Sequence, residues 1–158
     1  MRQILYTSST SRDTSAETLD SILATSRTNN TRDGITGVLL YIDGGFMQVL
    51  EGEPDLVEQT LNRIRKDPRH WNTGILLDRT AERVFGAWSM GFVQPSEAQL
   101  NSGTFRLTRD AMKTDFNLSR APELFVLLKS FYRIQADQML RNSAALSVLP
   151  DSPDTSSS

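Results

Sequence analysis

The sequence contains no cysteine and only one histidine, His70, among its 158 residues. Without cysteine the chain cannot form disulfide bonds, thiolate metal sites or a cysteine nucleophile. A single histidine cannot form a histidine cluster that binds a metal ion, so no metal site is expected. It is also the only residue that could act as the base of a Ser-His-Asp triad. His70 itself is expected to be a surface residue in a loop.

A strong charge imbalance and a long apolar run are also missing. Lys and Arg number 17 and Asp and Glu 19, which gives a net charge of -2, whereas a general nucleic-acid binder is normally basic. No apolar run approaches the roughly 18 residues that a membrane span needs, and the N-terminus lacks the apolar core of a signal peptide. We expect one cytoplasmic domain, or one with a helical appendage, that contacts neither nucleic acid nor membrane.

The most regular stretch, residues 34–52, predicts two β-strands joined by a tight turn. Apolar residues fill both faces of each strand, and the Asp-Gly-Gly at 43–45 provides the positive φ angles that such a turn requires. Strands that are apolar on both faces belong in the middle of a sheet with packing on each side. Gln48 interrupts this pattern, because it shares a face with Phe46 and Leu50. Its amide either pairs with a nearby polar group or faces a bound heterocycle.

The order of the remaining patterns is β-α-β-β-α-β-β. Further strands are expected at 3–8, 72–77 and 85–93, and helices at about 14–30 and 54–67. This order is the ferredoxin-like arrangement with one extra strand. The sequence therefore predicts an α+β fold with a five-stranded mixed sheet and two helices on one face.

Local signals define the helix ends and one ion pair. Thr14 is expected to cap the first helix in a capping box, and Asn29-Asn30 are expected to end it. Arg63 and Asp67 stand four residues apart on the second helix, which predicts a solvated ion pair.

The C-terminal region is expected to cover the opposite face of the sheet, for which Leu5, Leu39 and Val49 are candidates. Residues 105–116 form a weak helix candidate, and a stronger helix is expected from Ser119 to about Asn142. Its apolar stripe consists of Leu124, Leu127, Leu128, Phe131 and Ile134.

Further apolar residues, Phe125, Val126 and Tyr132, lie off that stripe, which predicts a second neighbour such as another subunit. Residues 150–158 are polar and are expected to be disordered. The expected organisation is a sensor or binding domain over 1–95, a helical extension over 96–142 and a disordered tail over 143–158.

Several groups of residues stand out together. They are Tyr6, Asn29-Asn30, Gly34-Ile35-Thr36-Gly37, Phe46-Met47-Gln48-Val49-Leu50-Glu51-Gly52, Arg63 and Trp88-Ser89-Met90. In this order and spacing they resemble a BLUF domain, a blue-light sensor that uses flavin, over about residues 1–93. The Phe-x-Gln-x-Leu-Glu-Gly strand is the most specific part of the resemblance.

The resemblance implies that FAD, or FMN, places its isoalloxazine ring between the two helices and against the sheet. Tyr6 and Gln48 would lie beside the N5/O4 edge, and Asn30, assisted by Asn29, would bind the O4/N3 edge. Arg63 would approach O2 at the pyrimidine end. Asp67 and His70 would lie toward the ribityl chain, with Trp71 adding an indole there, and the apolar walls would be Ile22, Phe46, Leu50 and Ile64.

The resemblance also implies a photochemical mechanism without substrate turnover, so the chain is not expected to be an enzyme. Excited flavin takes an electron and a proton from Tyr6, and the Gln48 amide relays the proton. Gln48 then has a changed tautomer or orientation, and its new hydrogen bond to O4 shifts the absorption to the red. The strand that carries Trp88 and Met90, which a period of two places on one face, would pass the change to the C-terminal helices.

Three functions remain as alternatives. The first is a blue-light photoreceptor which, with no effector domain after Val93, signals through a downstream protein partner or a homo-oligomer. The second is a flavin-dependent oxidoreductase that uses the same pocket, and the third is a flavin-free ferredoxin-like regulatory module. A flavin-free module would be colourless, and a light-driven, dark-reversible spectral shift without reductant would fit only the photoreceptor.

Overall fold

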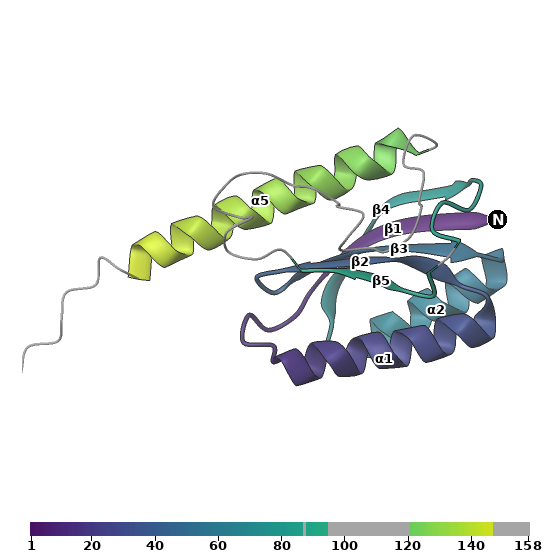
Figure 1. Cartoon of the computed structure of the whole chain (residues 1–158), viewed down its shortest axis with the longest axis horizontal. Coiled ribbons are helices and arrows are strands. Elements are labelled where there is room, and N and C mark those ends of the chain that lie inside the picture. Colours follow the sequence, from purple (N-terminus) through teal and green to yellow (C-terminus); the bar gives the residue numbers. More distant parts are fainter. Residues whose placement is uncertain (87, 95–120, 147–158) are drawn as a thin grey trace, which may run out of the picture.

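The computed structural model describes residues 1–86, 88–94 and 121–146. In this part of the chain, a five-stranded sheet is packed between α1 and α2 on one face and α5 on the other (Figure 1). The elements are β1 (Arg2–Ser9), α1 (Ala16–Asp33), β2 (Thr36–Ile42), β3 (Gly45–Gly52), α2 (Pro54–Lys66), β4 (Trp71–Thr80), β5 (Gly91–Val93) and α5 (Pro122–Leu146).

The strand order is β4-β1-β3-β2-β5. β2 pairs with β5 in parallel, and the other neighbours pair antiparallel. The predicted α+β fold with a mixed sheet is confirmed, and the β2–β3 hairpin lies in its interior. In this register Gln48 on β3 stands opposite Tyr6 on β1 and opposite Leu39 on β2.

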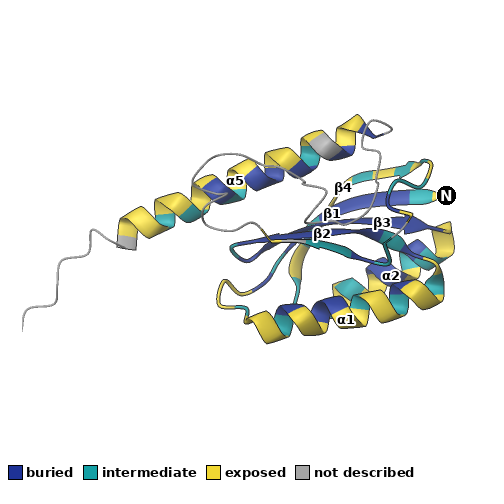
Figure 2. Cartoon of the chain, in the orientation of Figure 1, coloured by how far each residue is buried: buried dark blue, intermediate teal, exposed yellow. Residues whose placement is uncertain are grey.

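Alternation along the strands builds two separate cores, and the inner strands β1, β2 and β3 between them are mostly buried, whereas the edge strand β4 is largely exposed (Figure 2). Val38, Leu40 and Val49 face α5. Leu39 packs on the other face, with the core of α1 and α2, so its predicted position opposite these helices is wrong. Its neighbours Val38 and Leu40 occupy the α5 face, and the period of two excludes Leu39 from it.

The first helix begins one residue after its predicted cap and ends about one turn beyond its predicted stop. Ser15, not Thr14, is the N-cap, and its hydroxyl accepts from the Thr18 N–H at 3.1 Å. The helix continues through Asn29 and Asn30 and ends at Gly34, whose φ of 64° is readily adopted only by glycine. The stronger stop therefore displaces the Asn pair into the last turns of the helix.

The segment before β5 is not a strand, and this changes the position of Trp88. β5 contains only Gly91–Val93. Trp88 packs against the core on the α5 face, and Met90 belongs to the core on the α1/α2 face. The predicted placement of both side chains on one face is wrong because a turn, with the Trp88 N–H donating to the Phe85 carbonyl, replaces the extended backbone. A Cβ at Gly91 would collide with the Trp88 ring.

Helix α5 covers the face that was predicted to need a cover. It begins at Pro122, as expected for proline in a first turn, and continues to Leu146 rather than ending at about Asn142. Tyr132 was predicted to lie off the apolar stripe, but it is buried, and Ile134 was predicted to lie on the stripe, but it is 57% exposed. Both predictions are wrong. Steps of four residues from Leu124 through Leu128 and Tyr132 follow the contact line, whereas Ile134 lies on the opposite side.

The candidate helix over 105–116, Ser119 and the expected tail over 150–158 lie outside the described residues. Among the described helices, none combines the length and the apolar character that a membrane crossing requires.

Candidate functional site

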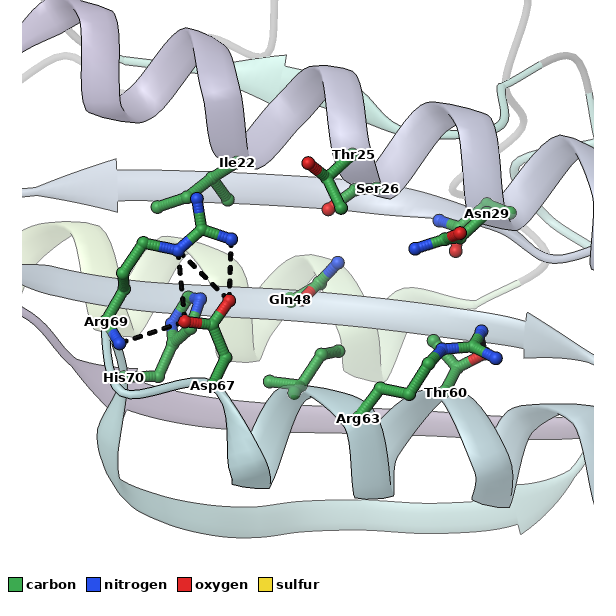
Figure 3. Close-up of a pocket in the computed structure, with 12 residues that line it drawn as sticks. Ile22, Thr25, Ser26, Asn29, Gln48, Thr60, Arg63, Asp67, Arg69 and His70 are labelled. Atoms are coloured by element: carbon green, nitrogen blue, oxygen red, sulfur yellow. Dashed lines mark hydrogen bonds and ion pairs between the residues drawn. The ribbon is translucent and has the colours of Figure 1, made fainter.

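A cavity of about 470 Å³, including its open mouth, lies between α1 and α2 above β3. Figure 3 shows side chains from both helices pointing into it, with Gln48 from β3 at the centre of its floor. The lining consists of Ile22, Thr25, Ser26, Asn29, Asn30, Gln48, Thr60, Arg63, Ile64, Asp67, Arg69 and His70. Eight residues that the sequence predicted separately are thus brought to one place.

Gln48, on the floor of the cavity, is the middle member of a directed hydrogen-bonded chain of three side chains, whose other two members lie in the core beneath it. The Tyr6 hydroxyl donates to Gln48 Oε1, and Gln48 Nε2 donates to the Met90 sulfur at 3.3 Å. The cross-strand pairing of Tyr6 with Gln48 places the first two groups side by side. Because Tyr6 is only 1% exposed, burial raises its pKa far above the usual value, and the phenol keeps its proton in the resting protein.

Asn29 and Asn30 enter the cavity from the last turns of α1. Asn30 is buried and its Nδ2 donates to the Ser89 carbonyl at 2.7 Å. One turn earlier, Arg27 Nε donates to the Met90 carbonyl at 3.0 Å. The end of α1 therefore holds the segment that carries the third member of the hydrogen-bonded chain.

Arg63 lies at the same end of the cavity as Asn29 (Figure 3). Its guanidinium donates to Asp33 at 2.7 Å and to the Thr60 hydroxyl at 2.9 Å. Hydrogen bonds from Arg32, and to a smaller extent from Arg63, hold the pKa of the Asp33 carboxyl well below its usual range. The predicted ion pair between Arg63 and Asp67 is wrong, because the end of α1 brings a different carboxylate closer.

Asp67 instead pairs with Arg69 at the other end of the cavity, with a shortest distance of 2.6 Å (Figure 3). Hydrogen bonds from the Arg69 side chain are the main cause that lowers the pKa of Asp67. Since α2 ends at Lys66, both residues lie on the following turn, where the helical spacing of four no longer applies.

His70 lies in the loop between α2 and β4, as predicted, but it is half-buried in the cavity wall and not on the open surface. Its ring centre lies 5.1 Å from that of Phe46, and its Nδ1 lies 3.4 Å from the Ser8 hydroxyl. Burial lowers the pKa of His70, and Asp67 opposes this to a smaller extent. The imidazole is therefore expected to be neutral at neutral pH.

Other predicted site residues lie beneath or outside the lining. Phe46 and Leu50 are fully buried in the core below the cavity, together with Tyr6. Trp88 packs on the far face of the sheet, 6.1 Å between ring centres from Phe85. Trp71, at the start of β4, is 48% exposed and does not belong to the described lining.

Sequence reasoning did not assign Thr25, Ser26, Thr60 or Arg69 to the site. The first three could have been found from helical spacing, because they precede Asn29 and Arg63 by three or four residues and so share their faces. Arg69 lies beyond the end of α2 and gives no such signal.

The cavity fits a planar heteroaromatic group with a polar rim. Ile22 and Ile64 contribute apolar walls from opposite helices, and the amides and the guanidinium converge at the edges. Concave sites with apolar walls and a few convergent polar groups are typical of small-molecule and cofactor binding. An isoalloxazine ring, which has carbonyl and ring-nitrogen groups on its rim, matches this set of donors and acceptors.

The sequence is similar to those of known light-responsive proteins. The photoactivated adenylate cyclase subunit beta of Euglena gracilis is 33% identical over 129 residues, covering 81% of this chain and 14% of that protein. The blue light- and temperature-regulated antirepressor BluF of Escherichia coli (strain K12) is 30% identical over 88 residues, covering 55% of this chain and 22% of that protein. The chain therefore spans only a small part of these relatives.

Solved structures of similar size also match. The dark-state structure of BlrB, a BLUF protein, aligns with a TM-score of 0.61 and 29% identity, covering 86% of this chain and 96% of that one. The ground state of BlsA aligns with a TM-score of 0.61 and 30% identity, covering 83% of this chain and 87% of that one. The family model described as sensors of blue-light using FAD matches residues 1–91. The chain thus belongs to the BLUF family, the sensors of blue light that use FAD.

Proposed function

We propose that this chain is a non-enzymatic photoreceptor in which Tyr6 and Gln48 register the excitation of a flavin bound between α1 and α2. The observation that carries the proposal is the chain from the Tyr6 hydroxyl through the amide of Gln48, the residue on the cavity floor, to the Met90 sulfur. This chain connects the proposed ring site to the segment before β5. A family that uses FAD argues against the flavin-free alternative.

The flavin would be FAD, or FMN, and several residues would hold it. Asn29, Asn30 and Arg63 would bind the polar rim at one end of the cavity, and Asp67 and His70 would lie toward the ribityl chain. Ile22, Ile64, Phe46 and Leu50 would form the apolar surroundings. Non-covalent binding is expected, because the sequence has no cysteine for a thioether link.

When bound, the flavin supplies absorption of blue light and an excited state that accepts an electron. Tyr6 is the expected donor of that electron, and its hydroxyl proton would pass along the existing hydrogen bond to Gln48, whose amide would relay it. Gln48 then changes its tautomer or orientation, so that its amide no longer donates to Met90 as before. No substrate is consumed, because the electron and the proton return to Tyr6, and the remaining change in Gln48 reverts in the dark.

The output is proposed to leave through α5 to a downstream protein partner or a second copy of the chain. Trp88, close to Met90 in sequence, packs in the same core as Leu124 and Leu128 of α5. On the outer side of α5, Val126 and Ile134 are 58% and 57% exposed. Both are large apolar residues, which suits a protein contact.

A pair of glutamine variants tests the proposal. Gln48→Leu should bind flavin but lose the light-driven, dark-reversible red shift, because the amide that exchanges hydrogen bonds is gone. Gln59→Leu, on the exposed side of α2, is the matched control and should shift normally. A normal red shift in Gln48→Leu would contradict the assigned role, and net flavin reduction by a nicotinamide donor would favour the oxidoreductase.

The outer face of α5 is tested separately with Ile134→Asp. Light-dependent elution volume should change less than in the wild type, while the red shift survives. Exposed Gln138→Asp on the same helix serves as the control for added charge. If the variant elutes like the wild type in both states, the output leaves by another surface.

A further inference from the structure

A second polar cluster lies outside the cavity, around Glu51 at the end of β3. Glu51 is 0% exposed, and no other acidic or basic side chain among the described residues is buried in this way. It stands on the same strand as Gln48, but the alternation along β3 directs the two side chains to opposite faces. A buried carboxylate is costly unless hydrogen bonds compensate for its lost hydration.

Four donors supply this compensation. Glu51 accepts from Gln3 Nε2 at 2.9 Å, from the Thr36 hydroxyl at 3.1 Å, and from the backbone N–H groups of Val84 at 3.0 Å and Phe85 at 2.6 Å. Two of the four belong to the backbone of the segment that follows β4. The carboxylate therefore fixes the position of a loop and does not merely fill the core.

Two arginines fix the direction of the side-chain hydrogen bonds. Arg79 Nε donates to Gln3 Oε1 at 2.9 Å, and Arg83 donates to the Thr36 hydroxyl at 2.6 Å. A guanidinium can only donate, so Gln3 must turn its NH₂ group, and Thr36 its proton, toward Glu51. The cluster requires a pure acceptor at its centre.

The same segment, residues 84–90, is held at its other end by the cavity. The carbonyls of residues 89 and 90 accept from Asn30 and Arg27, and the Met90 sulfur accepts from Gln48. The described residues of the segment thus extend from the carboxylate cluster to the floor of the cavity.

We propose that Glu51 is a positioning residue for the light response, because its carboxylate fixes the start of the 84–90 segment and so keeps the Met90 sulfur against the Gln48 amide. The inference rests on the proposed function, in which Gln48 changes its hydrogen bonds. Without the clamp the segment settles less firmly onto Gln48, and the return to the resting arrangement loses part of its driving force.

The variant Glu51→Gln tests the clamp with almost no change in shape. Both oxygens of Glu51 accept from donors, and an amide NH₂ group cannot accept a hydrogen bond. Whichever way the new glutamine turns, its NH₂ group therefore faces N–H or O–H donors. If that group faces Gln3, a rotation of Gln3 would only move the conflict to Arg79. Glu58→Gln, on the surface of α2 where Glu58 pairs with Arg2, is the matched control.

The first measurement reports the position of the segment and does not depend on photochemistry. The chain has two tryptophans, so Trp71→Phe in every variant leaves Trp88 as the sole indole in the flavin-loaded protein. Glu51→Gln should make Trp88 more accessible to acrylamide, and Glu58→Gln should not. Equal quenching in Trp71→Phe alone and in its combinations with Glu51→Gln and with Glu58→Gln would show that Glu51 does not fix the segment, even if the light response is normal.

The second measurement is the dark recovery of the red-shifted state. Glu51→Gln should slow it by about threefold or more, the range expected when a coupling contact is weakened, with flavin still bound. Arg79→Met, which leaves Glu51 in place, should slow it less and keeps the test available if Glu51→Gln does not fold. Recovery at the wild-type rate or faster in both variants would overturn the proposal, whereas absence of a red shift in the wild type would instead overturn the proposed function.

Discussion

The two faces of the sheet are built from alternate residues of the same strands, yet they differ in chemistry. The face toward α1 and α2 combines apolar residues with Tyr6, Gln48 and Asn30, all of which are buried. The face toward α5 is packed with aliphatic and aromatic side chains such as Val49 and Leu128, apart from the polar cluster around Glu51 at the end of β3. One face therefore has polar groups that can exchange hydrogen bonds beside a cavity, and the other provides mainly apolar packing, with its polar groups fixed at one end of β3.

This difference indicates that the two faces have different roles in the light response. A buried polar chain is sensitive to a change in one member, since each group depends on its partner in a medium of low dielectric constant. A close-packed apolar layer responds to displacement as a unit. The segment before β5 contacts both, because Met90 belongs to one core and Trp88 packs against the other.

The largest expected effect comes from removing one oxygen on the polar face. Tyr6→Phe should bind flavin and lose the reversible red shift completely, because the donor to Gln48 Oε1 is deleted while the ring remains. Tyr41→Phe is the control, since Tyr41 is a buried tyrosine of the same core, 5.0 Å between ring centres from Phe46. Light-minus-dark spectra of both variants decide the matter, and a red shift in Tyr6→Phe would refute the assignment.

On the apolar face, Leu128→Ala should reduce the free energy of unfolding by about 2–5 kcal/mol, because it opens a cavity in a packed core. Leu128 is 1% exposed, whereas Leu140 on the same helix is 43% exposed, so Leu140→Ala should cost less than about 0.5 kcal/mol. Denaturant unfolding measures both. The red-shift wavelength should be unchanged, and a shift altered by Leu128→Ala would mean that the faces are not separate.

Asn30→Ala should weaken flavin binding by about 1–3 kcal/mol, the cost of leaving a buried polar partner unpaired. The change also removes the 2.7 Å hydrogen bond to the Ser89 carbonyl. Fluorescence titration with FAD gives the dissociation constant, and exposed Asn62→Ala on α2 is the control. An unchanged affinity would place Asn30 outside the binding set.

The smallest effect concerns pH and His70. Burial lowers the pKa of folded His70 below the ordinary value of 6.5, so the unfolded chain binds a proton first as the pH falls. The free energy of unfolding therefore keeps its full value above about pH 6.5, as far as His70 is concerned, and decreases as the pH falls from there to the pKa of folded His70. Melting of the flavin-free protein from pH 7.5 to 5.5 should show this decrease, and His70→Gln should remove it. His70 is the only histidine, so an equal decrease in the variant would exclude it as the cause.

Much of this difference between the two faces could be predicted from the sequence, because strand alternation and helix spacing are local properties. The interior hairpin, the floor residue Gln48 and the contributions of Asn29, Asn30 and Arg63 all follow from period, turn chemistry and resemblance. Some errors concern which face a residue takes inside an element, as for Leu39 in β2 and Ile134 in α5. Others occur where regular structure ends. Gly34 ends α1, and the turn after Phe85 places Trp88 and Met90 on different faces.

Partner choice in ion pairs was the other source of error. Spacing along α2 favoured Asp67 for Arg63, but Asp33 from α1 is the actual partner at 2.7 Å. Such contacts depend on how two helices meet across the cavity, which no single helix encodes. The same holds for Glu51, because its donors come from strands and loops that are distant in sequence.

In the proposed mechanism, light changes the polar face without consuming a substrate. The absorption spectrum of the purified, flavin-loaded chain tests this most directly when it is recorded before blue light, after it and after return to darkness, with no reductant present. We predict a red shift that forms in light and disappears completely in the dark. Failure to take up FAD or FMN, an unchanged spectrum, or lasting bleaching of the flavin would contradict the account.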